Sequence, residues 1–191
     1  APTAGMVLRW FRDELGGESD YEALSALAAE VPAGSDGLIV LPHLTGSFCP
    51  DLNPEANGVF YGVKLSHGRG HFARAICESI AYMLRHNLET LAMMGVETDT
   101  ICSLGGASRS ELWLQIKADV LNKRVIVPEG DETTCLGTAL LAAVGTGVYA
   151  SLEEASEGMV RIKKQFEPDA EMVKVYEKTY QKYKQINALL L

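Results

Sequence analysis

Two adjacent glycines, Gly105 and Gly106, stand between a short apolar segment and a helix-like segment in the stretch SLGGASRS. Without side chains, the main chain there can lie against a flat ring or a ribose, and the unpaired amides at a helix start favour a phosphate. Ser108 or Ser110 is placed to cap the helix that follows. The same pair is also typical of a tight turn from strand to helix that needs a positive φ. Taken alone, the pair therefore leaves two interpretations open, a nucleotide site and a plain turn.

Two common nucleotide fingerprints are missing from the sequence. It contains no GxxxxGK[ST] loop, so phosphates are not held in the manner of that class. It also has no GxGxxG after a first strand, and no acidic residue is positioned about twenty residues further on to bind a ribose. A dinucleotide-dependent oxidoreductase domain is therefore disfavoured, although it remains an alternative.

Other chemically active side chains favour structural roles. His67 and His71 are four residues apart, but the intervening Gly68 and Gly70 disfavour a shared helical turn and no third ligand is near in sequence, so we expect no metal site. Arg74 and Glu78 are one helical turn apart and are interpreted as an ion pair rather than as catalysts. Trp10 and Trp113, the two tryptophans of the chain, are expected to anchor their helices in the core.

Composition limits the classes of partner. The chain has 191 residues, 47% of them hydrophobic, which fits one domain or a large piece of a bigger molecule. Its net charge of −8 disfavours nucleic acid and anionic membranes as partners. Four scattered cysteines form no CxxC pair and no secretory signal precedes them, so we expect a reduced, cytoplasmic setting. No apolar stretch is long enough for a membrane helix.

Hydrophobic periodicity predicts alternating helices and strands. Helices are expected over residues 5–15, 21–31, 70–95, 108–122, 133–147 and 173–190. In the first of them, Val7, Leu8, Phe11 and Leu15 are expected on one apolar face. Strands are expected over residues 38–42, 59–65, 100–104, 124–128 and 160–168, with a long irregular loop over 43–58. The last helix carries an apolar stripe that is expected to pack against the domain. This order predicts a layered α/β domain with a central sheet flanked by helices, whose ligands usually lie at the carboxyl edge of the strands.

Several blocks, in order, resemble the FGGY carbohydrate kinases. Residues 58–78, GVFYGVKLSHGRGHFARAICE, depart from the second signature of that family at Cys77, where the family usually has a larger aliphatic or aromatic residue. They match that signature at Gly58, Phe60, Gly62, Val63, His71, Phe72, Ala75, Ile76 and Glu78. Residues 105–125 and 128–143 are similar to the block that holds the adenine end of ATP in the family. Residues 4–15 resemble the helix that follows the phosphate-contacting hairpin. The resemblance implies an actin-like ATPase (ribonuclease H-like) fold.

Carried over residue by residue, the resemblance implies nucleotide contacts at Gly5, Arg9, Gly106 and Ser110, with Gly105 beside them. Arg9 is expected to lie over the base or to reach an oxygen atom. Some family members have asparagine where Ser110 stands. The resemblance assigns no catalytic residue and no metal ligand to this chain.

The resemblance further implies that residues 1–191 are the carboxyl-terminal, nucleotide-binding domain of a longer kinase. The absent amino-terminal domain would bind the sugar, and the catalytic aspartate also lies outside this chain. The whole protein is expected to use ATP and magnesium to phosphorylate a hydroxyl of a pentulose or related sugar, with xylulose the first expectation. This chain alone would be inactive, and a homodimer is possible for the whole protein. The alternative is a noncatalytic actin-like domain that binds nucleotide only as a conformational ligand.

Overall fold

The computed structural model describes residues 4–17, 20–130 and 133–190. The helices are α1 (Ala4–Trp10), α2 (Tyr21–Ala29), α3 (Arg69–Met93), α4 (Glu111–Leu121), α5 (Thr133–Gly145), α6 (Leu152–Met159) and α7 (Ala170–Leu190). The strands are β1 (Ile39–Leu41), β2 (Val59–Tyr61), β3 (Thr100–Cys102), β4 (Arg124–Pro128) and β5 (Ile162–Phe166). Each helix and strand expected from the sequence has a counterpart in the structure, whereas α6 was not predicted.

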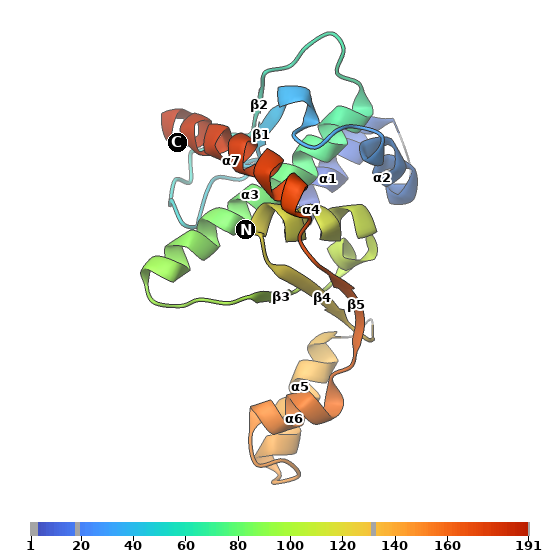
Figure 1. The fold of residues 1–191 in the computed structure, drawn as a ribbon, viewed down its shortest axis with the longest axis vertical. Helices are drawn as coiled ribbons and strands as arrows, with labels where there is room; N and C mark the ends of the chain where they lie inside the picture. The colour runs from blue at the N-terminus through green and yellow to red at the C-terminus, as the bar shows by residue number, and fades with distance from the viewer. Residues whose placement is uncertain (1–3, 18–19, 131–132, 191) are drawn as a thin grey trace.

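The strands are divided between two small sheets. β1 pairs antiparallel with β2, whereas β3, β4 and β5 form a mixed sheet in which β3 and β4 are parallel and β5 is antiparallel to β4. The mixed sheet lies beneath α4, and α5 and α6 project from its far end as a hairpin (Figure 1). No described side chain of α5 is buried. The parallel pair places the carboxyl ends of β3 and β4 at the same edge, next to the glycine pair.

The long helix α3 is the centre of the main core. Its side chains are buried from Ala73 to Met83, and α2 and α4 pack on it. The close crossing with α2 depends on Gly70, because a Cβ atom there would meet the Leu27 carbonyl oxygen. The expected stripe on α7 also packs into this core through Tyr176, Tyr180 and Tyr183, although Leu190 at its end is exposed.

Glu78 is the hub of a buried polar network. Its carboxylate accepts hydrogen bonds from the amide of Gly34 (2.9 Å), Ser35 Oγ (2.9 Å), Arg74 Nε (2.9 Å) and the Tyr176 hydroxyl (3.1 Å). Burial raises the pKa of Glu78, while Arg74 and the other donors act in the opposite direction. The expected ion pair one helical turn apart is confirmed. The Glu78 carboxylate also holds the turn at Ser35, whose φ of 49° is unusual for a residue with a side chain.

The first helix differs from its prediction in one respect. Val7 and Phe11 are buried as the helical period requires, but Leu15, expected on the same face, is 57% exposed. The chain leaves the α-helix after Trp10 and continues as a π-helical turn over Phe11–Gly16. A π turn holds more residues than an α turn, so side chains beyond it rotate away from the predicted face.

The tryptophans have the expected structural roles. Trp113 is buried and its indole Nε1 donates to the Cys77 carbonyl oxygen at 3.1 Å. Trp10 is half-buried and stacks on Phe60 with ring centroids 6.4 Å apart. Both residues therefore anchor the helices that carry them to the main core.

Candidate functional site

The glycine pair forms the turn between β3 and α4. The Ser103 amide donates to the Ile126 carbonyl oxygen at 2.8 Å, which extends the pairing of β3 and β4 by one residue. Gly105 then reverses the chain, and Gly106–Arg109 form the single 3-10 turn η3. Ser110 caps α4, as one of the two predicted serines, by accepting the Trp113 amide at 3.3 Å. The amide nitrogens at the start of α4 thus lie at the carboxyl edge of the sheet.

The two glycines differ in whether the backbone conformation requires them. Gly105 has φ 75° and ψ −161°, a conformation that residues with side chains rarely adopt. Gly106 has no positive φ, and a Cβ atom added to it would meet no atom of the described residues within 4 Å. The turn therefore explains a glycine at position 105, whereas neither backbone geometry nor packing among the described residues explains the glycine at position 106.

This contrast gives a measurable difference in stability. Gly105→Ala is expected to lower the free energy of unfolding by about 1–2 kcal/mol, because alanine is strained at that φ. Gly106→Ala is expected to change it by less than about 0.5 kcal/mol. Urea unfolding of both variants measures the difference. Equal losses would show that the two positions have the same backbone requirement.

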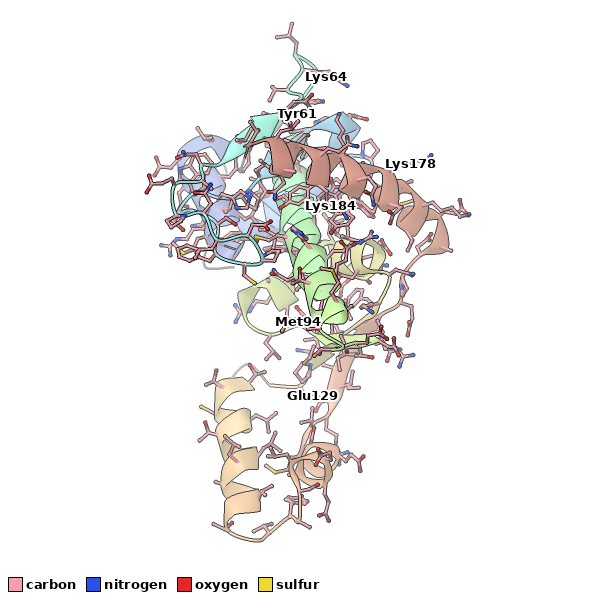
Figure 2. All side chains as sticks on the ribbon, turned by 90° about the vertical axis from the view of Figure 1, so that its left-hand side faces the viewer. Tyr61, Lys64, Met94, Glu129, Lys178 and Lys184 are labelled. Atoms are coloured by element: carbon pink, nitrogen blue, oxygen red, sulfur yellow. The ribbon has the colours of Figure 1, made fainter. Side chains whose placement is uncertain are left out.

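A small open pocket borders the glycine turn. Its volume is about 180 Å³ and its walls come from the turn, from the end of β4 and from the start of α5. The lining residues are Ser103, Leu104, Gly105, Gly106, Ser108, Arg109, Val127, Pro128, Gly130 and Thr133. Glu129, between two of these residues in sequence, lies where the α5–α6 hairpin leaves the sheet (Figure 2). The pocket is thus at the junction of the sheet and the hairpin.

The expected contact residues are only partly gathered there. Gly105 and Gly106 line the pocket, and Ser110 follows at the end of η3, where its hydroxyl is 3.0 Å from that of Ser25 on α2. Gly5 and Arg9 lie on α1 and are not among the lining residues. The Arg9 side chain is exposed and pairs with Asp13 at 3.5 Å. A nucleotide contact by these two residues therefore stays a prediction.

Ser103 and Lys117 were not anticipated from the sequence. Lys117 lies on α4, is only 8% exposed, and donates from Nζ to Ser103 Oγ at 3.1 Å. Its ammonium group also lies over the Trp113 ring, 5.1 Å from the centroid. Burial lowers the pKa of Lys117. The sequence feature that could have revealed Lys117 is its position on the face of α4 that also carries the buried Trp113, Leu114 and Val120.

The histidine pair has hydrogen-bonding roles of its own. The His67 and His71 rings stack with centroids 5.0 Å apart, and the Nδ1 atom of each accepts a backbone amide, at 3.3 and 3.2 Å respectively. His71 Nε2 also lies 3.2 Å from Asp36 Oδ2. Over residues 4–17, 20–130 and 133–190, no three His, Cys, Asp or Glu side chains gather in a way that could hold a metal ion.

Comparison with known proteins identifies the family. The profile described as "FGGY family of carbohydrate kinases, C-terminal domain" matches residues 2–146. The chain belongs to this family. It is 35% identical over 183 residues to xylulose kinase of Bacillus subtilis, covering 96% of this chain and 37% of that protein. It is also 36% identical over 168 residues to gluconokinase of the same organism, covering 80% of this chain and 32% of the relative.

Solved structures of FGGY kinases show the same fold. The crystal structure of xylulose kinase from Rhodospirillum rubrum is similar with a TM-score of 0.84 at 34% identity, over 97% of this chain and 38% of that one. Ligand-bound xylulose kinase from Lactobacillus acidophilus gives a TM-score of 0.89 at 27% identity, over the same shares. The expected actin-like ATPase fold is confirmed. The chain spans little more than a third of the length of these FGGY kinases.

Proposed function

We propose that this FGGY domain binds the adenosine portion of ATP at the glycine turn. The observation that carries the proposal is Gly106, which is unstrained, has open space where a side chain would stand, and lines the pocket. Space of this kind lets a purine or ribose lie against the main chain. The position also agrees with the rule that ligands bind at the carboxyl edge of strands in α/β sheets.

Residues around the turn would divide the nucleotide between them. Gly105 and Gly106 provide room for the adenosine, and the Ser110 hydroxyl provides a hydrogen bond at the start of α4. Gly5 and Arg9 on α1 would address the base or the inner phosphate. Magnesium would be held mainly by the nucleotide's own phosphates and by parts of the kinase outside residues 1–191. No side chain of this chain is assigned as the catalytic base.

The whole protein would transfer the γ-phosphate of ATP to a hydroxyl of xylulose or a related sugar. This is supported by relatives named xylulose kinase that align with 96% of the chain. A sugar-binding domain, a cytoplasmic location and a homodimer are parts of the same proposal. Among the described helices, none has the combination of length and apolar character that a bilayer crossing requires.

Nucleotide titration of residues 1–191 is the direct test. We expect ADP and ATP to bind with nearly equal dissociation constants near the millimolar range, about 4 kcal/mol, with little effect of magnesium. The reason is that an open half-site leaves polar contacts exposed to water and lacks the groups that clamp the γ-phosphate and the metal. Nuclear magnetic resonance shifts should cluster at Gly5, Arg9, Gly105, Gly106 and Ser110.

Shifts around the loop at residues 43–58 instead, or none at high nucleotide concentration, would show that this domain does not hold the adenosine. The chain alone is expected to transfer no phosphate to xylulose, gluconate or glycerol. A longer protein containing it is expected to phosphorylate xylulose with ATP and magnesium. Nucleotide binding by that longer protein with no transfer to any sugar would instead favour the noncatalytic actin-like domain.

A further inference from the structure

Lys117 is a buried lysine that forms no ion pair with any residue the structure describes. No carboxylate of the described residues pairs with it, and its contacts are Ser103 Oγ and the face of the Trp113 ring. The Cys77 thiol on α3 would attract Lys117 if it were ionised, but burial raises the pKa of that thiol to about 12, so it is neutral near pH 7. An unpaired buried cation costs stability, so packing alone does not account for a lysine here.

The hydrogen bond to Lys117 sets the direction of the Ser103 hydroxyl. An ammonium group has donors and no acceptor, so the oxygen of Ser103 must accept this bond. The hydroxyl hydrogen is then left to point elsewhere, and no atom of the described residues accepts it. Because Ser103 lines the pocket, an acceptor within the pocket is the available partner.

We propose that Ser103 is a further nucleotide contact, donating a hydrogen bond to an oxygen acceptor of the nucleotide, and that Lys117 positions and polarises that hydroxyl. The inference rests on the proposed function, since the ligand is the adenine nucleotide of the same pocket. A hydroxyl that accepts from a cation is a stronger donor than a free one, because successive hydrogen bonds polarise one another at low dielectric. Lys117 would therefore act on the nucleotide through the Ser103 hydroxyl and not by touching the nucleotide itself.

The test compares ADP affinity with stability in Ser103→Ala, Lys117→Met and the double variant of this chain. Ser103→Ala is expected to raise the dissociation constant for ADP about tenfold, the effect of one hydrogen bond assisted by a charge. Lys117→Met is expected to raise it about threefold or more while the urea midpoint stays the same or increases, because methionine keeps the packing and removes the buried charge. The double variant is expected to bind no more weakly than Ser103→Ala, since the two residues act as one unit.

Lys163→Met is the matched control, because Lys163 is exposed on β5 and its loss changes the net charge equally. Its ADP affinity should equal that of the unaltered chain. A lower urea midpoint for Lys117→Met with unchanged ADP affinity would show that the lysine is only structural and would overturn the inference. Equal ADP affinity in all variants, with normal binding by the unaltered chain, would overturn it while leaving the proposed function standing. No ADP binding by the unaltered chain would overturn both.

Discussion

Glu78→Ala is expected to lower the free energy of unfolding by about 3–5 kcal/mol, the range found when one partner of a buried ion pair is removed. The variant leaves Arg74 buried without its carboxylate, and it removes the acceptor of Gly34, Ser35 and Tyr176. The turn at Ser35, which has a positive φ, also loses the contact that holds it. Such a loss is a large share of the stability of a typical domain.

Urea unfolding followed by circular dichroism measures this change. Glu171→Ala is the control, because Glu171 forms an ion pair with Lys174 at 2.7 Å on the exposed face of α7. Exposed pairs contribute little, so we expect a change of less than about 1 kcal/mol. Similar losses in the two variants would show that burial of the Glu78 network has no special importance.

Gly106→Val is expected to abolish measurable ADP binding while the chain stays folded. The valine side chain would occupy the space assigned to adenosine, and from a starting affinity near the millimolar range a loss of even about 1.4 kcal/mol is tenfold. We expect a small stability cost, within about 1 kcal/mol, because Gly106 has no positive φ and no described residue has an atom within 4 Å of an added Cβ. Titration with ADP, monitored by nuclear magnetic resonance, measures the binding.

Gly145→Val is a matched control for the valine substitution. Gly145 also has no positive φ and open space around an added Cβ, but it lies at the end of α5 and does not line the pocket. Its ADP affinity should match that of the unaltered chain. An unchanged ADP affinity in folded Gly106→Val would mean that the glycine pair is only a turn.

Local patterns were sufficient for the helices and strands but not for their pairing. The period of α3 and the apolar run of β4 are visible in single segments, and both elements lie where expected. The division into two sheets depends on contacts such as Ile39 with Tyr61, which are far apart in sequence. The exposure of Leu15 was missed because a π turn changes the period without a recognisable residue signal.

The candidate site was predictable where the backbone itself is unusual. Gly105 and Gly106 are bare in the sequence, and the serine cap three residues before Trp113 follows ordinary capping rules. Ser103 and Lys117 could not be recognised in the same way, because a serine after a strand and a lysine in a helix are individually common. Their importance comes from the hydrogen bond between α4 and the end of β3, which only the folded chain shows.

The position of α7 has a consequence for the order of events during synthesis. Tyr176, Tyr180 and Tyr183 are completely or almost completely buried, yet they belong to the last helix of the sequence. The Tyr176 hydroxyl also forms hydrogen bonds with Arg74 and Glu78, which are synthesised about 100 residues before it. While the nascent chain is still on the ribosome, α3 therefore exposes the apolar surface and the charges that α7 will cover. We expect this surface to stay exposed until α7 has emerged from the ribosome and packed against it.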